Sequence, residues 1–437
     1  MTTAPAVRDT GVDPAPRESR RAWTVTALLV VFMMVNFADK SVLGLAADEI
    51  RADLHLSATQ FGLANSAFFL LFSVAAIVVG MAADRVSPKL LLLVMAVLWS
   101  VAQVPAAIGG GLAVLIGSRI FLGAAEGPAF PVAQQATLSW FPNHKRNLPA
   151  ALLTIGITLG VIISSPSLSW VIQNHGWRSA LWVLAAIGVV WAVLWSVFGK
   201  DSPRGHTTDG AKAVADKAVA DEAAAAPKVP YRKIFASRTW IGSTLAYFMS
   251  YWSVALMLVW MPSYLRNALD YSAATAGKLV VLPWAVGAVV LLGQAALTGR
   301  LMRRGVGSRK ARGWVGGFML AIGAVCCVLV PFVGSVPAQT VLVSLGFGFA
   351  GSYATVAATT VAELAPAARS GGALGLMNAL VTVSGLLAPA AVGALVDAQG
   401  DAGYQYAVLV TGVLVAIGAV LAFALIDPER DRARLTA

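Results

Sequence analysis

The chain has little charge for its 437 residues. Only 12% of the residues are charged, whereas 58% are hydrophobic, and the mean hydropathy is +0.75. A soluble domain has roughly 25% charged residues, because its surface must be hydrated. The scarcity of charge therefore excludes an ordinary soluble globular protein and predicts that most of the chain lies in a membrane.

Side chains that commonly carry catalysis or hold metals are also scarce. The four histidines fall in predicted loops, isolated from one another. Cys326 and Cys327 are adjacent in an apolar segment, where neighbours rarely form a disulfide and no metal-binding spacing occurs. The sequence has no nucleophile–base pair, metal cluster or phosphate-binding loop. We therefore expect neither an enzyme nor a bound metal or organic cofactor.

Long apolar runs are what the chain has instead. Each approaches the ~20 residues that a helix needs to cross the hydrocarbon core, and the short alternating segments of a membrane barrel are missing. The sequence therefore predicts an all-α membrane protein with twelve transmembrane helices in two pseudo-symmetric six-helix halves. The expected spans are residues 23–46, 60–82, 89–109, 112–136, 149–171, 178–198, 239–265, 273–299, 312–333, 338–361, 370–396 and 403–426.

The positive charge is distributed unevenly along the chain. Most of the 32 lysines and arginines fall in alternate predicted loops, in the central stretch and near the two termini. With the amino terminus inside the cell, these positions are cytoplasmic, as the positive-inside rule requires. The net charge of +11 is thereby explained without a nucleic-acid partner. We predict a multi-pass protein with both termini in the cytoplasm.

The membrane part consists of two segments of similar design. Arg146 and Pro166 are separated by the same interval as Arg369 and Pro389, and each pair begins and then interrupts a span. This register indicates two diverged copies of one unit, as in transporters built from parallel repeats. The expected parts are a cytoplasmic N-terminal segment (1–22), an N-terminal bundle (23–198), a cytoplasmic linker (199–238), a C-terminal bundle (239–426) and a cytoplasmic tail (427–437).

Four charged residues stand inside predicted spans. Asp39 and Lys40 belong to the first span, and Arg119 and Glu126 to the fourth. A charge near the bilayer centre costs at least ~2.5–3.5 kcal/mol, so it persists where it is paired or faces a polar cavity. Two acids and two bases on different helices indicate such a cavity between helices, which suits a carrier. A static ion pair that only orders the bundle is the alternative.

The depth of these residues can be counted along each helix. At ~1.5 Å per residue, Asp39 and Arg119 lie at similar depths, so we expect them to pair. Glu126 lies on nearly the same helix face as Arg119 and ~10 Å deeper, with no obvious basic partner. Burial should favour its protonated form, which suits reversible proton carriage. Pro128 and Pro131 follow closely, and we expect them to loosen the helix locally, so that backbone groups line a cavity.

Aromatic residues are frequent in the seventh and eighth spans. Tyr247 and Tyr251 lie one turn apart, so they either wall the apolar part of a substrate or pack between helices. Tyr353 in the tenth span is a weaker candidate for substrate binding.

The loop GMAADRVSPK closely resembles the signature of the major facilitator superfamily, with Gly80, Asp84, Arg85 and Lys89 at the matching positions. An acid at a helix end beside bases suits a cytoplasmic charge latch that breaks when the two halves rock apart. Ordinary positive-inside charge is the alternative. The second half has Gly299 where the acid would stand, so only the first latch is complete.

Within that superfamily the chain resembles the anion:cation symporter family over nearly its whole length. The resemblance rests on NFADKSVLG, SRIFLGAAEGPAFP, WFPNHKR, GWRSALWVLAAIG, WMPSYL and GLMNALVTVSGLLAP. Members import organic anions, usually with protons. The resemblance implies a monomeric secondary transporter of a bacterial inner membrane that works by alternating access. Its partners would be a small organic anion, protons as coupling ion, and the lipid bilayer.

The resemblance also implies roles for single residues. Asp39 and Glu126 match the family's proton-coupling carboxylates, and Arg119 matches its fourth-span arginine. Lys40 stands where many members have arginine, so a flexible ammonium replaces a planar fork. The expected substrate-binding residues are Lys40, Arg119, Tyr247, Tyr251, Tyr353 and Asn378, of which Asn378 matches an eleventh-span amide.

Two positions depart from the family pattern. Ile157 and Tyr247 stand where sugar-acid transporters often have polar amides. The loss of two polar contacts favours a more apolar carboxylate, aromatic or weakly hydroxylated, over a sugar acid. An efflux antiporter of the same fold and a membrane sensor that binds ligand without transport are the alternative functions.

Overall fold

The computed structural model describes residues 16–82, 86–141, 145–202 and 229–436, and the regular structure in these ranges is helical. Within them, twelve helical segments are long and apolar enough to cross a membrane. The predicted all-α class with twelve spans is therefore confirmed. The segments are Arg20–Leu45, Ala58–Val79, Pro88–Ile108, Leu112–Leu138, Leu148–His175, Trp177–Phe198, Arg238–Val259, Ala273–Arg303, Arg309–Phe332, Val336–Leu364, Arg369–Gln399 and Ala402–Leu425.

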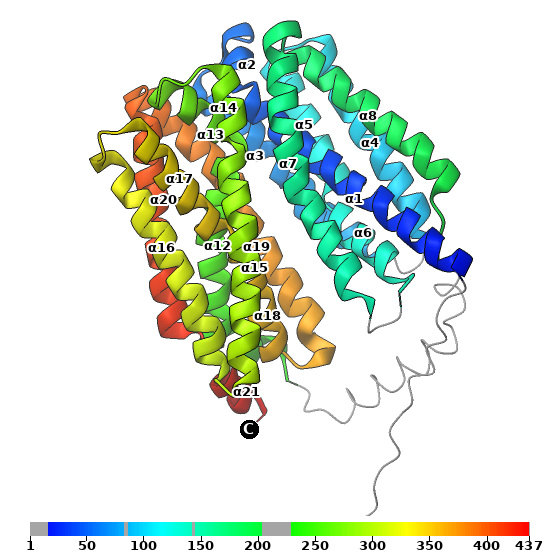
Figure 1. Ribbon diagram of the computed structural model, residues 1–437, viewed down its shortest axis with the longest axis vertical. Coiled ribbons are helices and arrows are strands. Elements are labelled where there is room, and N and C mark those ends of the chain that lie inside the picture. The colour runs from blue at the N-terminus through cyan, green and yellow to red at the C-terminus, as the bar shows by residue number, and fades with distance from the viewer. Residues whose placement is uncertain (1–15, 83–85, 142–144, 203–228, 437) are drawn as a thin grey trace, which may run out of the picture.

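The N-terminal half lies on the right of Figure 1. Within it, α1 packs against α7, α3 against α5, and α4 against α8. A short helix, α2, joins the first two spans at the upper end of the view. The helices of this half are α1 (Pro16–Leu45), α2 (Ala47–Asp53), α3 (Ala58–Ala82), α4 (Pro88–Ile108), α5 (Leu112–Glu126), α6 (Ala129–Leu138), α7 (Asn147–His175) and α8 (Trp177–Phe198).

The C-terminal half lies on the left of Figure 1. Here α16 and α12 both pack against α20, and α15 packs against α17. The helices are α11 (Tyr231–Phe235), α12 (Arg238–Val259), α13 (Met261–Ser263), η2 (Tyr264–Ala268), α14 (Ala273–Leu279), α15 (Val281–Arg303), η3 (Arg309–Trp314), α16 (Val315–Leu329), η4 (Val330–Phe332), α17 (Val336–Gly351), α18 (Ala354–Leu364), α19 (Ala367–Gln399), α20 (Ala402–Leu425) and α21 (Pro428–Thr436).

Local sequence signals explain where several helices begin. The side chains of Ser87, Ser237 and Ser272 accept hydrogen bonds from the backbone three residues later, at the starts of α4, α12 and α14. Such caps satisfy N–H groups that have no partner inside the helix. Gly176, at a φ of 82°, makes the tight turn between α7 and α8, which a side chain would strain.

The two halves repeat a common pattern of interruptions. Arg146 precedes α7 and Pro166 lies inside it, as Arg369 lies at the start of α19 and Pro389 inside it. The fourth span is divided between α5 and α6, and the tenth span between α17 and α18. The fourth and tenth spans hold the same place in the two halves, so the breaks extend the repeat that the sequence predicts.

Parts of the predicted organisation lie outside the described residues. These are residues 1–15 of the predicted N-terminal segment and residues 203–228 of the predicted linker. The start of α1 and the terminal helix α21 lie at the same end of the molecule, the lower end in Figure 1.

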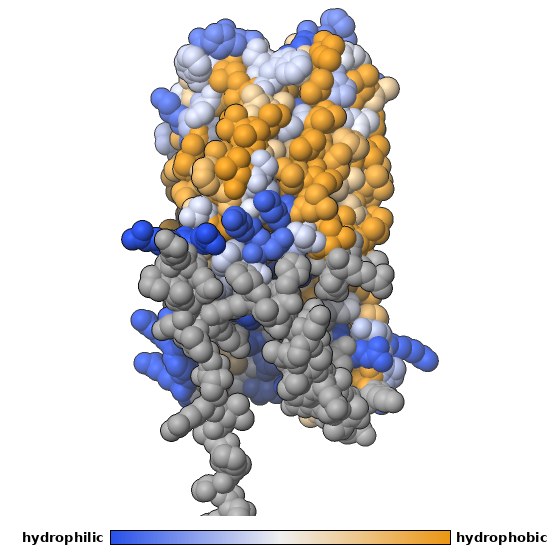
Figure 2. Space-filling view, turned by 90° about the vertical axis from the view of Figure 1, so that its right-hand side faces the viewer, coloured by the Kyte–Doolittle hydropathy of each residue, from blue (hydrophilic) through white to orange (hydrophobic). Residues whose placement is uncertain are grey.

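Apolar side chains cover much of the outer surface of the spans. Figure 2 shows hydrophobic side chains over the upper part of one face, with hydrophilic residues along the top edge and lower down. Large apolar side chains on the spans are more than half exposed, for example Val289 and Leu292 on α15 and Val420 on α20. An exposed apolar surface of this extent is stable against lipid and not against water.

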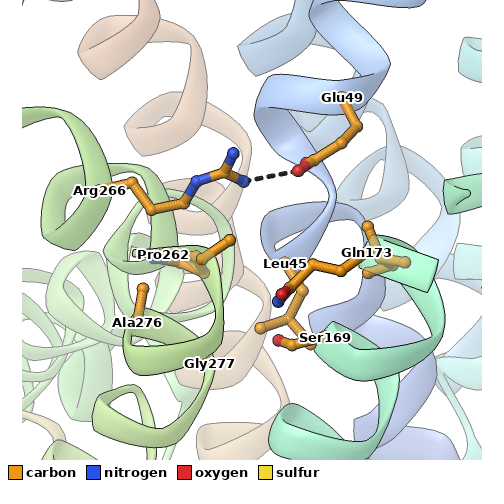
Figure 3. Close-up of a pocket in the computed structure, with 10 residues that line it drawn as sticks. Leu45, Glu49, Ser169, Gln173, Pro262, Arg266, Ala276 and Gly277 are labelled. Carbon is orange, nitrogen blue, oxygen red and sulfur yellow. Dashed lines mark hydrogen bonds and ion pairs between the residues drawn. The ribbon is translucent and has the colours of Figure 1, made fainter. Parts of the chain in front are cut away.

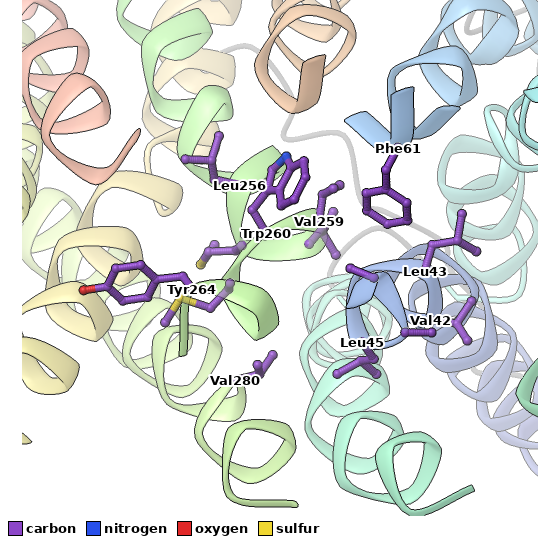
Figure 4. Packing of buried hydrophobic residues seen from close by; sticks show 14 of the residues in the cluster. Val42, Leu43, Leu45, Phe61, Leu256, Val259, Trp260, Tyr264 and Val280 are labelled. Carbon is purple, nitrogen blue, oxygen red and sulfur yellow. The ribbon is translucent and has the colours of Figure 1, made fainter. Parts of the chain in front are cut away.

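Three apolar clusters form the interior. One lies in the N-terminal half around Phe32, Trp99 and Trp191. A second lies in the C-terminal half around Tyr353 and Met377. The third joins the halves near their upper ends. Figure 4 shows Val42, Leu43, Leu45 and Phe61 facing Leu256, Val259, Trp260, Tyr264 and Val280 across this boundary.

Candidate functional site

Four charged side chains meet inside the N-terminal half. Asp39 and Lys40 stand on α1, and Arg119 and Glu126 on α5, with Glu126 as the last residue before the break in the fourth span. Asp39, Arg119 and Glu126 are at most 3% exposed. The structure therefore brings together the four intramembrane charges that the sequence singles out. Charges this deeply buried interact strongly, because little water screens them.

The pairing among these four residues differs from the expectation. The Lys40 ammonium lies 3.3 Å from a carboxylate oxygen of Glu126 and donates to the Asn36 side-chain oxygen. The prediction that Glu126 has no basic partner is therefore wrong. The depth count placed residues by their backbones, whereas the long, flexible lysine side chain carries its charge to another level.

Asp39 and Arg119 do not form the expected pair. Neither carboxylate oxygen of Asp39 has a hydrogen-bond partner among the described residues, and the same holds for Nε and Nη1 of Arg119. Similar depth along two helices does not fix the direction in which two side chains point. The result is a buried guanidinium with two unused donors beside a buried carboxyl group.

Two glycines bring α5 into contact with the backbone of α3. A Cβ atom at Gly123 would lie 1.8 Å from the Phe68 carbonyl oxygen, and one at Gly127 would lie 2.1 Å from that of Phe72. Only glycine allows such an approach. It places Arg119 and Glu126 next to the phenylalanines of α3.

Aromatic rings surround the Lys40 ammonium. Its nitrogen lies 4.5 Å from the ring centroid of Phe37, 5.5 Å from that of Phe72 and 5.9 Å from that of Phe68. The Arg119 guanidinium lies 5.7 Å from the Phe68 ring. Cations within about 6 Å of a ring face are attracted by its quadrupole, which offsets part of the cost of burial.

The rings continue into the C-terminal half. Phe69 of α3 meets Tyr251 of α12 edge-on, with centroids 6.2 Å apart, and Tyr251 meets Tyr247 at the same distance. Phe37 likewise contacts Trp284 of α15 at 6.2 Å. Tyr247 and Tyr251 thus join the site through α3. Trp284 belongs to the aromatic-rich eighth span that the sequence analysis noted. Sequence reasoning missed the phenylalanines, for which the signal was the aromatic-rich AFFLLF of the second span.

Tyr353 and Asn378 are placed differently. Tyr353 is fully buried in the core of the C-terminal half, and its ring packs against Gly316 of α16. Asn378 is exposed on α19, one turn before Thr382, whose hydroxyl contacts that of Ser73 on α3. No described hydrogen bond, ion pair or ring contact joins either residue to the four charges.

The predicted cytoplasmic latch is described only in part. Gly80 lies in α3, whereas Asp84 and Arg85 lie outside the described residues. The Lys89 ammonium donates to the Ser196 carbonyl oxygen at 3.0 Å, and its backbone N–H donates to Asp201 at 2.9 Å. These contacts tie α4 to the end of α8 within one half, so Lys89 is engaged away from the boundary between halves.

A polar layer closes the upper end of the boundary. Arg266 of η2 binds Glu49 at 2.8 Å and Asp48 at 3.2 Å, both on α2, as Figure 3 shows for Glu49. Leu45, Ser169, Gln173 and Gly277 line a small pocket below this ion pair. Sequence reasoning missed this network, because its charges appeared to be ordinary loop charges.

A second link at this end joins α19 to the start of α3. The two carboxylate oxygens of Asp397 accept hydrogen bonds from the backbone N–H groups of Ala58 and Thr59, each at 2.8 Å. A residue of one half thus caps a helix of the other. The described hydrogen bonds and ion pairs between the halves are concentrated at this end, and the ribbons diverge toward the opposite end in Figure 1.

Comparisons with known proteins all point to the same family and the same fold. The family model "Major Facilitator Superfamily" matches residues 29–359 and 320–437. A probable sulfoacetate transporter of Cupriavidus necator is 29% identical, over 92% of this chain and 93% of that protein. A hexuronate transporter of Bacillus subtilis is 28% identical, over 92% and 94%. A D-galactonate transporter of Escherichia coli is 26% identical, over 93% and 96%.

Solved structures match the fold at low sequence identity. A bacterial homologue of the human lysosomal transporter Spinster, inward-facing and occupied, gives a TM-score of 0.77 at 16% identity, over 97% of this chain and 99% of that one. A D-xylose–proton symporter gives 0.74 at 15% identity, over 94% and 99%. The predicted fold and the resemblance to anion:cation symporters are confirmed.

Proposed function

Because this chain belongs to the Major Facilitator Superfamily and is a secondary transporter rather than an enzyme, we propose that it imports a small organic anion together with protons. The observation that carries the proposal is the buried group of two acids and two bases, Asp39, Lys40, Arg119 and Glu126. The names of the relatives support an organic anion as cargo, since sulfoacetate, hexuronate and galactonate are all such anions.

Arg119 is the proposed anchor of the anion. Its Nε and Nη1 have no hydrogen-bond partner among the described residues. A guanidinium presents donors in a planar fork that matches a carboxylate or sulfonate. A buried cation with unused donors is costly until an anion arrives, so the geometry favours an anionic cargo.

Glu126 and Lys40 supply the proposed coupling between proton and cargo. The Lys40 ammonium is engaged by Glu126 at 3.3 Å, so it is not free for a second anion. Protonation of Glu126 removes this competitor and releases Lys40 to the substrate. Asp39 accepts a proton in the same step, because an ionised carboxylate without partners is costly when buried. Proton and anion then bind together.

Alternating access follows from the two halves. We place both termini in the cytoplasm of a bacterial cell, with the chain as a monomer in the inner membrane. The contacts of Arg266 and Asp397 then close the outer side, and the site is reached from the cytoplasm. Opening toward the outside requires these contacts to break and the halves to rock. The proposed substrate contacts of Tyr353 and Asn378, and the latch of Asp84 and Arg85, belong to other stages of this cycle.

The test is proton movement driven by substrate. Purified protein is reconstituted into vesicles that hold a pH dye, and sulfoacetate, D-galactonate, glucuronate and aromatic acids are added outside in turn. We expect one class of anion to acidify the interior. Asp39→Asn and Glu126→Gln should abolish the acidification, because each removes a proton-binding group. Asp401→Asn is the matched control: it makes the same change in charge at an exposed residue.

Each of the other possible results would support a different function or exclude the proposed coupling residues. Alkalinisation of the interior on addition of substrate would indicate an antiporter of the same fold. Specific binding without flux would indicate a ligand sensor. Acidification that persists in both carboxylate variants would exclude Asp39 and Glu126 as coupling groups.

A further inference from the structure

We propose that the transported anion carries a flat apolar group, as an aromatic carboxylate does, and that Phe69, Phe72 and Tyr251 form the surface that binds this group. The inference rests on the proposed function, since it assigns the cargo of the same site. It concerns specificity, whereas the charged residues concern anion binding and coupling.

A continuous series of rings leads away from the charged residues. The Phe72 ring lies 5.5 Å from the Lys40 ammonium, the Phe69 ring lies 6.0 Å from Phe72, and the Tyr251 ring lies 6.2 Å from Phe69. Phe69, Phe72, Tyr251 and Tyr247 are all partly exposed, although they lie within the bundle. An anion held by Lys40 and Arg119 therefore has an aromatic surface directly beside it.

The rings have fixed positions. The Phe69 ring lies over Gly385 of α19, where an added Cβ would come within 2.7 Å of its edge. Tyr251 meets Phe69 at 87° and Tyr247 at 90°. Edge-to-face contacts of this kind are a preferred geometry of aromatic pairs, and the rings, which are only partly buried, leave surface for a further flat group.

Only some of the polar groups near these rings are paired, and those without a partner among the described residues include two N–H donors, Asn36 Nδ2 and Trp284 Nε1. The Asn36 side-chain oxygen accepts from Lys40, and the hydroxyls of Ser73 and Thr382 contact each other. A sugar acid brings several hydroxyls that need partners, and burial of unpaired hydroxyls against phenylalanine is unfavourable. An aromatic acid needs one anchored end and one flat apolar surface, and the site supplies both.

The surface also crosses the boundary between the halves. Phe69 and Phe72 belong to the N-terminal half, whereas Tyr251 belongs to the C-terminal half. A ring bound there touches both halves at once. Such a substrate therefore stabilises the arrangement in which the rings of α3 and α12 are close, which links cargo recognition to closure around it.

The experiment measures binding of matched anions to the purified full-length protein by titration calorimetry. The probes are benzoate, acetate and D-galactonate, each at a pH where it is ionised. We expect benzoate to bind at least about tenfold more tightly than acetate or D-galactonate, because the ring gains contacts that the others lack. D-galactonate binding more tightly than benzoate would overturn the proposal.

Variants separate the ring surface from the charged anchor. Phe72→Leu and Tyr251→Leu keep apolar volume but remove the flat face, and each should weaken benzoate about fivefold or more and acetate less than twofold. Tyr406→Leu is the control, because Tyr406 is exposed on α20. An equal loss for benzoate and acetate would show that these rings only support the anchor.

The outcomes also distinguish this inference from the proposed function. If D-galactonate binds and drives acidification while benzoate does neither, the proton-coupled importer stands and the ring surface is rejected. If none of the three anions binds and no anion in the wider panel moves protons, the proposed function itself fails. A melting curve for each variant confirms that it is folded before its affinity is compared.

Discussion

Lys40 has neighbours of three kinds: the carboxylate of Glu126, the amide of Asn36, and aromatic rings led by Phe37 at 4.5 Å. Each offsets part of the cost of burying an ammonium. When Glu126 is protonated, the amide and the rings remain. In the coupling step proposed above, the Lys40 ammonium is then available to an anion. An arginine at this position would present a wider, rigid fork and a different set of contacts.

A carboxylate at the opposite end of the chain has a structural role. The Asp431 carboxylate of α21 accepts hydrogen bonds from the backbone N–H and hydroxyl of Thr239, both at 2.8 Å, and from Nε of Arg430. Burial by itself raises the pKa of a carboxyl group. Here the hydrogen bonds from Arg430 and Thr239 outweigh burial and hold the pKa of Asp431 below its usual value.

The Asp431 contacts predict a pH-dependent contribution to stability. A carboxyl group whose pKa is lowered by folding stabilises the protein above its usual pKa of about 3.9, and this contribution disappears as the pH falls through the lowered value. Asp431→Ala should therefore lower the melting temperature at pH 7, through a loss of about 1–3 kcal/mol. The difference from the wild type should shrink as the pH falls below about 4.

Melting curves in detergent between pH 7 and pH 3 measure this effect. Asp401→Ala serves as the control, because Asp401 is exposed and forms no side-chain cap on α20. A melting temperature at pH 7 that is the same for Asp431→Ala and the wild type would show that the Thr239 contacts do not contribute.

At the scale of helices, the fourth span has two features: a close contact with the backbone of α3 and a break between α5 and α6. Gly123 in α5 and Gly127 directly after this helix let the span approach α3, and the break after Glu126 ends α5 within the membrane. The expected loosening of this span is seen at Pro128, which lies in the break between α5 and α6, whereas Pro131 lies in the first turn of α6. The two features together fix where Glu126 stands relative to α3.

The contact between α5 and α3 is tested by Gly123→Ala. The new Cβ would lie 1.8 Å from the Phe68 carbonyl oxygen, and a backbone atom has no rotamer by which to move away. We expect α5 to be displaced from α3, with a loss of about 1–3 kcal/mol or more. The melting temperature and the substrate-driven acidification should therefore both decrease.

Gly117→Ala is the matched control in the same helix. Apart from its chain neighbours and the nearby backbone of its own helix, no atom lies within 4 Å of the position of its new Cβ, and the residue is exposed. We expect it to keep the melting temperature of the wild type or to raise it slightly, because alanine favours helix more than glycine does. Equal behaviour of the two variants would contradict the role of the Gly123 contact.

At the scale of the whole molecule, two features hold the halves together at one end. The first is the apolar cluster around Phe61 and Trp260, whose ring centroids are 5.5 Å apart. The second is the polar network of Arg266 with α2 and of Asp397 with α3. The apolar cluster contains residues of both halves, whereas the polar contacts are hydrogen bonds and ion pairs of defined geometry.

Asp397→Asn should shift the balance between conformations. The side-chain oxygen of an asparagine can accept from the N–H group of Ala58 or of Thr59. Its NH2 group then faces the remaining N–H group, and two donors oppose each other. If the substitution removes about 1–2 kcal/mol of stabilisation from the conformation closed at this end, the ratio of the conformation closed at the opposite end to this one rises roughly 5- to 30-fold. We expect a longer mean distance between the upper ends of the halves.

Distances between paired spin labels measure this shift. Exposed positions at the upper ends, Asn174 in the N-terminal half and Ser335 in the C-terminal half, suit the labels. Asp401→Asn again serves as the control for charge. An unchanged distance distribution in Asp397→Asn would show that the apolar cluster alone keeps this end closed.

The sequence by itself determined the class of the protein, its spans and its charged residues. Apolar runs of helical length have only one stable form in a bilayer, because each backbone group must be hydrogen-bonded within its own segment. The cost of charge in a membrane then singled out Asp39, Lys40, Arg119 and Glu126 as residues expected to lie together between helices. These conclusions need only the properties of single helices.

The tertiary structure decided what those residues contact. Lys40 pairs with Glu126 because its side chain reaches beyond the level of its own backbone. Phe69 meets Tyr251, and Asp397 meets Ala58, only because the two halves fold against each other. Partners so distant along the chain leave no periodic signal, since periodicity reports which face of a helix is buried and not which helix covers it.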